Sequence, residues 1–171
     1  IIKPQLLRRE KKDVARDLPK KLFEPACRTL PISPRQRSLY GQALSEFRKT
    51  ASGNGSAHLG LLQFLRRLCS DPLVEDEYQS DRASVAEILE HSPKMDWLMD
   101  ALREIQGKSE KVIVFCEFRI LQRTLQRCIA STFGIHVDVI NGDTSAAADH
   151  AASRQKRIRA FQEKPGFGVI V

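Results

Sequence analysis

The sequence predicts an α/β fold in which a parallel sheet with helices on both faces follows a purely helical region. Apolar residues recur at helical spacing between residues 33 and 107. From residue 111 the pattern changes to short apolar runs rich in β-branched residues, which are typical of strands in a parallel sheet. Helical segments separate these runs, and such a β-α-β-α-β order requires right-handed crossovers between parallel strands.

The helical region is expected to contain helices over residues 33–49, 61–69 and 93–107. The first and the third open with a serine followed by a proline, which is a typical N-cap and first helical residue. A solid leucine stripe on one face of the second predicts that this face is buried. Gly107 is expected to end the third helix as the residue after its C-cap.

The α/β region is expected to contain strands 112–116, 137–140 and 168–171, with helices over 121–129 and 154–161 between them. The first strand is apolar at every position, so we expect it to be buried on both faces. Ile158 and Phe161 are the expected buried anchors of the last helix.

Composition excludes several classes of protein. The chain has 171 residues, of which 42% are hydrophobic and 29% charged, as in ordinary globular domains. No apolar run approaches the roughly 20 residues of a membrane-spanning helix. The four cysteines are far apart and form no C-x-x-C pair, which favours buried thiols in a reducing compartment over disulfides or a zinc site.

Charge is distributed unevenly along the chain. Residues 1–50 hold 13 basic and 5 acidic side chains, whereas residues 71–110 hold 4 basic and 11 acidic ones, within a net charge of +7. Arg154, Lys156, Arg157 and Arg159 form a second basic cluster. Both a polyanion-binding surface and an ordinary solvated face remain open at this point.

Ligands of open parallel sheets bind beyond the carboxyl ends of the strands. This rule directs attention to Glu117–Arg119 after the first strand and to Asn141–Ser145 after the second. We expect small side chains and free backbone amides in the latter segment, suited to sugar-phosphate contacts. Arg154, in the first turn of the next helix, could reach a phosphate from the same edge. An ordinary Asn-Gly turn remains the alternative.

Other kinds of site find little support. Gly107-Lys108-Ser109 resembles the end of a phosphate-binding P-loop, but it closes a helix and precedes a strand, which is the reverse of the required order. None of the four histidines has a nucleophile and a carboxylate at a suitable local spacing. Ligand spacing typical of a metal site is also missing. We therefore expect no catalytic residue and no metal ligand in this chain.

Six elements in a fixed order resemble the SWI/SNF-related DNA-dependent ATPases, and together they cover nearly the whole chain. They are Leu6–Arg9 with Lys12, Val14 and Asp17–Lys20; Gln36 with Tyr40; Leu65–Pro72; Ser92 with Lys94 and Leu98; Lys111–Phe118; and Asn141–Ser145 with Arg154, Ile158 and Phe161. Phe167–Val171 resembles the start of helicase motif V. The sequence departs from the family's motifs at two points: Ser70-Asp71 replaces Asn-His, and Asn141 replaces Asp. The resemblance therefore leaves open which contacts these two points make.

The resemblance implies a fold and a domain organisation. Residues 1–32 correspond to a segment between two lobes, and residues 33–110 to a helical protrusion with its lead-in helix. Residues 111–171 correspond to the second RecA-like helicase lobe, cut short in motif V. The chain begins at Ile1 rather than Met and ends in a strand-like run, so we expect a piece of a longer protein.

The resemblance also implies an ATP-dependent motor that moves on double-stranded DNA, in which this chain supplies the lobe that grips DNA phosphates and closes on ATP. The expected phosphate contacts are Arg119, Asn141, Gly142, Thr144, Ser145 and Arg154. Arg8, Arg9 and Lys94 are secondary candidates, because they could instead brace the two lobes.

The implied cofactors of the full-length protein are ATP and Mg²⁺. This chain lacks the P-loop, the metal-binding acidic box and motif VI, so it is expected to bind neither and to be inactive alone. The expected partners are double-stranded DNA and the first RecA-like lobe, with a protein–DNA complex as a further candidate. A membrane is not an expected partner. The expected location is intracellular, on the DNA.

Two other functions remain as alternatives. A non-catalytic module could use the same sheet and basic residues to hold a nucleic acid or a protein. A stand-alone Rossmann-type nucleotide binder is disfavoured, because no glycine-rich turn follows the first strand.

Overall fold

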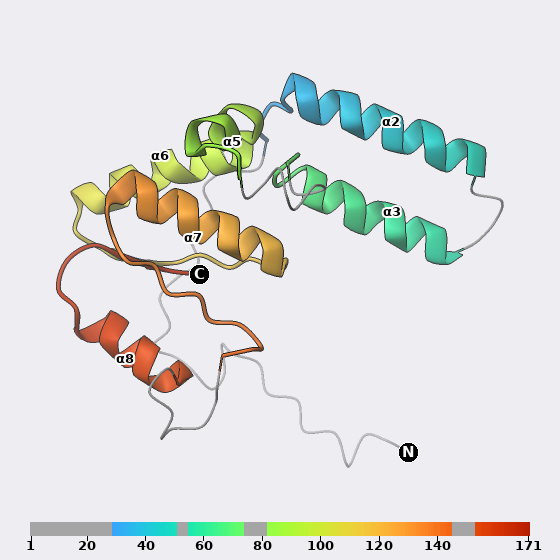
Figure 1. Ribbon diagram of the computed structural model, residues 1–171. Coiled ribbons are helices and arrows are strands. Elements are labelled where there is room, and N and C mark those ends of the chain that lie inside the picture. The colour runs from blue at the N-terminus through green and yellow to red at the C-terminus, as the bar shows by residue number, and fades with distance from the viewer. Residues whose placement is uncertain (1–28, 51–54, 74–81, 145–152) are drawn as a thin grey trace, which may run out of the picture.

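The computed structural model describes residues 29–50, 55–73, 82–144 and 153–171 (Figure 1). Its elements in chain order are α2 (Pro34–Thr50), α3 (Gly55–Leu68), α5 (Val85–His91), α6 (Pro93–Gly107), β1 (Lys111–Ile113), α7 (Arg119–Phe133), α8 (Arg154–Glu163) and β2 (Gly168–Ile170). The candidates Arg8, Arg9 and Ser145 lie outside the described residues, as does most of the segment 1–32.

The sheet is parallel, as the sequence predicts. β1 pairs with β2 in the register Lys111 to Gly168 and Ile113 to Ile170. The segment 138–140 lies along the other side of β2, because the N–H of Val171 donates to the carbonyl of Asp138 at 2.9 Å. The last strand in the sequence is therefore the central one, and the two earlier segments flank it.

Helices cover both faces of this sheet (Figure 1). Val169 and Val171 face α6 and α7, where they join a core that contains Met99, Leu102 and Ile129. Helix α8 lies on the opposite face (Figure 1). The predicted fold class is thus confirmed: a small parallel sheet between helices, preceded by a helical region.

The first strand differs from the prediction of burial on both faces. Its regular part is Lys111–Ile113, and Ile113 and Phe115 are 59% and 91% exposed. Side chains alternate along a strand, so Val112 and Val114 reach the core while Ile113 and Phe115 point to the other face. Within the described residues α8 covers that face only in part.

Neither expected anchor of helix α8 is buried, but Phe161 packs against β2. The ring of Phe161 lies so close to β2 that a Cβ at Gly168 would be 3.3 Å from it. Ile158, in contrast, is 38% exposed, so its prediction as a buried anchor was wrong. The reason is that Ile158 lines an open cavity on this sheet face together with Ile113 and Phe115, so no side chain covers it fully.

The helical region also departs from the prediction in detail. Helices α2 and α3 lie side by side (Figure 1). Among the α3 residues whose burial the structure describes, Leu65 and Leu68 are the buried ones, whereas Leu62 is 57% exposed, so the leucine stripe is not a wholly buried face. The left-handed residue after α6 is Ser109 at φ 56°, and Gly107 is the last residue of that helix.

One helix, α5, was missed by the sequence analysis. Its seven residues are too few for a periodic apolar pattern. The usable signal was the pair Ser84 and Glu87, because a serine N-cap followed three residues later by a glutamate is typical of a capping box. In the structure the Ser84 hydroxyl accepts a hydrogen bond from the Glu87 N–H at 3.2 Å.

Buried polar contacts join the helices of the helical region to one another. The Gln36 side chain donates to the carbonyl of Leu68 at 3.1 Å, and the Ser33 hydroxyl donates to the carbonyl of His91 at 2.8 Å. At the end of α3, Asp71 Oδ1 accepts from the Leu73 N–H at 2.9 Å and from the Ser92 hydroxyl at 3.3 Å. These contacts hold the start of α6 against the end of α3.

Asp71 carries an electrostatic cost in this junction. It is fully buried, and among the described residues its Oδ2 atom has no hydrogen-bond partner. Burial raises the pKa of this carboxyl above its ordinary value, although the hydrogen bonds from Leu73 and Ser92 and the charges of Arg127 and Arg35 oppose the shift. Folding therefore shifts the equilibrium of this carboxyl toward its protonated form.

This shift predicts how Asp71→Asn changes stability with pH. A raised folded-state pKa means that the native protein loses stability as pH rises from about 4, where the unfolded aspartate ionises, through the raised value. Asparagine keeps the acceptor atom and never ionises. We expect D71N to raise the free energy of unfolding at pH 7, with the gain shrinking toward pH 3.

Urea unfolding of both proteins between pH 3 and pH 8 measures this difference. Asp100→Asn, at an exposed position on α6, is the matched control and should stay within about 0.5 kcal/mol of the parent. The predicted pH dependence would be wrong if the gain in stability of D71N over the parent were smaller at pH 7 than at pH 3.

Candidate functional site

The loop after the segment 138–140 is closed by its own hydrogen bonds. The N–H of Asn141 donates to Thr144 Oγ1 at 3.1 Å, and the N–H of Thr144 donates to the Asn141 carbonyl at 3.1 Å. The N–H of Asp143 donates to Asn141 Oδ1 at 2.9 Å, which forms an Asx turn. Three amides that were expected to be free are thus engaged, because the Asn141 and Thr144 side chains fold back onto the backbone.

A buried glutamine fixes this loop to the rest of the sheet. Gln122, on α7, is 7% exposed; its Oε1 accepts from Asn141 Nδ2 at 3.0 Å, and its Nε2 donates to the Cys116 carbonyl at 3.0 Å. One amide side chain therefore joins the segment after β1 to the loop 141–144. The sequence analysis did not identify Gln122, because it lies on a helix and pairs with positions distant in sequence.

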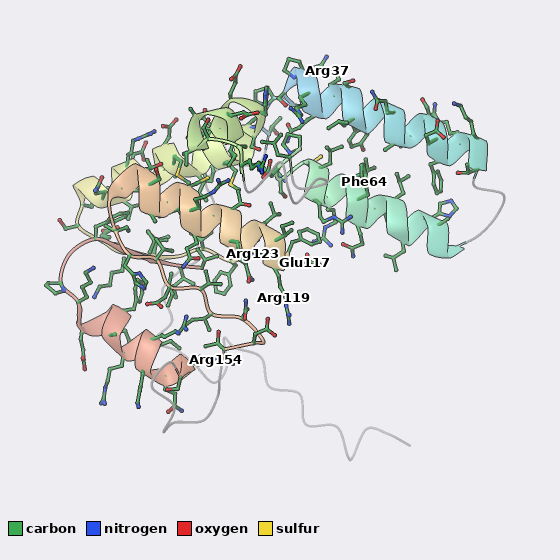
Figure 2. The ribbon with its side chains drawn as sticks, viewed as in Figure 1. Arg37, Phe64, Glu117, Arg119, Arg123 and Arg154 are labelled. Atoms are coloured by element: carbon green, nitrogen blue, oxygen red, sulfur yellow. The ribbon has the colours of Figure 1, made fainter. Side chains whose placement is uncertain are left out.

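Arginines from two helices surround the loop. Arg119 Nη1 lies 2.8 Å from Asp143 Oδ2, and a Cβ at Gly142 would be 3.4 Å from Arg119 Nη2. Arg154 Nη2 donates to the carbonyl of Asn141 at 3.2 Å. Figure 2 shows Arg119 at the start of α7 and Arg154 at the start of α8, both on the side where the loop lies. The described phosphate-contact candidates are therefore brought together.

A cavity of about 300 Å³ opens between α7 and this loop. Its lining residues are Arg119, Gln122, Arg123, Gln126, Val139, Asn141, Asp143, Thr144 and Arg157. Guanidinium groups and amides in such a hollow can bind the oxygens of an anion. Arg123 and Arg157 were not among the predicted residues. The spacing of Arg119 and Arg123, one helical turn apart, was a signal that could have found Arg123.

Lys94 lies elsewhere. It lines a second cavity, of about 530 Å³, between the helical region and the end of the first strand. There Arg66 forms a two-pronged ion pair with Glu117, and its guanidinium is 5.7 Å from the centre of the Phe118 ring. Glu117, which was expected to lie where a ligand binds beyond the first strand, is instead paired with Arg66 of the helical region. Lys94 lies at this second cavity and not at the loop 141–144.

The described residues offer no candidate for a metal site, a reactive thiol or a membrane-spanning helix. No group of three or more His, Cys, Asp or Glu side chains there could hold a metal ion. Burial raises the pKa of the Cys128 thiol to about 11, which makes a reactive thiolate unfavourable at neutral pH. None of the described helices combines the length and apolar character that crossing a membrane requires.

Comparison with known proteins places this geometry in a family. The chain is 41% identical to the Zorya protein ZorD of Escherichia coli over 100% of its length, and 30% identical over 96% of its length to YwqA of Bacillus subtilis, which is named as an ATP-dependent helicase/translocase. The Sulfolobus solfataricus SWI2/SNF2 ATPase core domain superposes with a TM-score of 0.68 over 99% of the chain at 21% identity. The chain has the fold of the SWI2/SNF2 ATPase core.

The likeness to SWI2/SNF2 ATPases extends to an isolated C-terminal domain. The isolated C-terminal domain of the Sulfolobus ATPase matches with a TM-score of 0.67 and 20% identity, over 81% of this chain and 59% of that domain. This chain spans only 16% and 17% of the lengths of ZorD and YwqA. No protein-family profile matches it. The predicted resemblance to SWI/SNF-related ATPases and the predicted helicase-like fold are confirmed.

The Gln122 bridge generates a stability prediction for Gln122→Ala. Truncation leaves the Cys116 carbonyl and the Asn141 amide without their partner in a mostly buried place. We expect a loss of about 2 kcal/mol in the free energy of unfolding, because each buried group left unpaired costs about 1–3 kcal/mol. Urea unfolding measures it. Gln106→Ala, at an exposed position on α6, is the control and should change the free energy of unfolding by less than about 0.5 kcal/mol. Equal losses in the two variants would show that the Gln122 bridge does not stabilise the fold.

Proposed function

We propose that this chain forms the second lobe of an ATP-dependent translocase that acts on double-stranded DNA, and that it grips DNA phosphates at the loop 141–144. The observation that carries the proposal is the convergence of Arg119, Arg123, Arg154 and Arg157 at one edge of the sheet. These arginines come from two helices on opposite faces and meet around a single loop.

The chemistry of this edge suits phosphate better than a neutral ligand. Guanidinium groups present several donors in a plane that matches phosphate oxygens. The loop amides of Asn141, Asp143 and Thr144 are engaged internally, so side chains must supply most of the contacts. The Thr144 hydroxyl uses its oxygen to accept from Asn141 and keeps its own proton for donation to an anion.

The relatives support DNA as the partner. One superposed structure, with a TM-score of 0.67, is the Sulfolobus SWI2/SNF2 ATPase core in complex with double-stranded DNA. Contacts to phosphates carry no sequence information, so the proposed contact is with the DNA backbone and independent of sequence. A protein–DNA complex is a further proposed substrate, and the proposed location of the protein is on intracellular DNA.

ATP and Mg²⁺ are proposed to bind to the longer protein and not to this segment by itself. Gly107 ends α6, and Lys108 and Ser109 precede β1, so this tripeptide cannot present helix N-terminal amides to a phosphate. The described residues also provide no acidic cluster for a metal ion. We assign the nucleotide site to the junction with a first lobe, residues 33–110 to a helical protrusion and residues 111–171 to the second lobe.

Arginine substitutions test the DNA contact. We expect Arg119→Ala and Arg154→Ala each to weaken DNA binding about two- to tenfold, equally on duplexes of unrelated sequence, and to lower the slope of log affinity against log salt by about one. Fluorescence anisotropy over a salt series measures both quantities. Arg103→Ala, an exposed arginine paired with Asp100 on α6, is the matched control. Loss confined to one sequence, or an equal loss in R103A, would contradict backbone contact at this edge.

ATP hydrolysis tests the motor. We expect the longer protein that contains both lobes to hydrolyse ATP faster when double-stranded DNA is added, and the 171-residue chain alone to show no turnover. A phosphate-release assay with and without duplex DNA checks both. Turnover by the chain alone would overturn the assignment of the nucleotide site. A longer protein that binds DNA but never hydrolyses ATP would instead support a non-catalytic binding module.

A further inference from the structure

We propose that Asp143 is a built-in competitor of the DNA phosphate, occupying Arg119 through an ion pair that a phosphate must replace before the loop can grip DNA. This inference rests on the proposed function and concerns its regulation. It assigns to one acidic residue the role of weakening a contact that the surrounding arginines favour.

The ion pair occupies the group best placed for a phosphate. Asp143 Oδ2 lies 2.8 Å from Arg119 Nη1, and the other terminal nitrogen of Arg119 lies against Gly142. The guanidinium therefore lies over the tip of the loop and is held there by the carboxylate. Asp143 is the only acidic residue among those that line the 300 Å³ cavity, as far as the structure describes the chain.

The loop geometry keeps the carboxylate in place. The Asp143 N–H donates to Asn141 Oδ1, and the Asn141 side chain is in turn held by the buried Gln122. The backbone at Asp143 is thus fixed before Arg119 arrives, which reduces the conformational entropy lost when the pair forms. The pair joins the first turn of α7 to the tip of the loop 141–144, the two elements that would have to receive one phosphate together.

The exchange is chemically balanced, since one oxyanion replaces another on the same guanidinium and no covalent bond changes. The carboxylate is released to water, and Asp143 is exposed enough to be solvated there, with 67% of its side chain accessible. Arg119 is similarly exposed, at 65%. An ion pair at this exposure is weak, so it can lower the affinity for a phosphate by only a few fold and cannot block binding.

Such a weak competitor suits a contact that must form and release repeatedly. Removing it is expected to tighten DNA binding, beyond the general effect of deleting one negative charge. The sign separates this role from a purely structural one, because the loss of a loop-stabilising ion pair would weaken binding rather than strengthen it. Charge-conserving Asp143→Glu is expected to keep the affinity near that of the parent.

The experiment measures the affinity of the 171-residue chain for a double-stranded DNA of arbitrary sequence, by anisotropy at low and physiological salt. We expect Asp143→Asn to tighten binding about two- to fivefold. Asp100→Asn is the matched control: it also removes one carboxylate that is paired with an arginine at 2.5 Å and is 68% exposed, but on α6. It should change the affinity by less than about 1.5-fold.

A double variant identifies the competing group. In the Arg119→Ala background, Asp143→Asn should have no more effect than Asp100→Asn, because the competition acts through Arg119. Tightening by Asp143→Asn that persists without Arg119 would overturn the inference, and so would an affinity equal to or below that of the parent. If Arg119→Ala weakens binding while Asp143→Asn changes nothing, only the inference fails. If neither the parent nor any variant binds DNA, the proposed function fails with it.

Discussion

The two hydrogen bonds of the Gln122 side-chain amide join the segment after β1 to the loop 141–144. In a parallel sheet the carboxyl ends of neighbouring strands are aligned by backbone pairing, but the loops beyond them have no ladder to fix their positions. Gln122 supplies that connection from α7, donating to the Cys116 carbonyl and accepting from the Asn141 side chain. Because the amide is buried, both bonds form where water cannot replace them, and the positions of the arginines around the loop depend on them.

The electrostatics of this edge follow from which charges the fold brings together. The acidic stretch 71–110 contributes none of the described residues around the loop 141–144, whereas α7 and α8 contribute four arginines. Asp143 and Asp138 are the acidic residues engaged there, each by one of those arginines. Positive charge at the edge is therefore moderated by two carboxylates and not cancelled.

The helical region contributes a different kind of constraint. Its helices are joined to one another through buried polar groups, among them Asp71, whose charge the interior disfavours. Replacing such a group by an apolar one can stabilise a fold, so its value lies in geometry: it fixes α6 relative to α3. The Arg66–Glu117 pair adds a contact between α3 and the segment after β1. Helix α3 is thereby positioned relative to the segment after β1.

Local pattern determined the parallel α/β class, most helices and the family, because apolar periodicity and serine caps act over a few residues and the order of motifs is a property of the chain itself. It also located the loop after the second strand. Tertiary structure alone decided that the last strand is central, that Phe115 is exposed and that the loop amides are engaged, since each depends on which distant segments meet. Arg123, Gln122 and the pairing of Arg119 with Asp143 belong to that second group, because hydrogen bonds and ion pairs across elements leave no local signature.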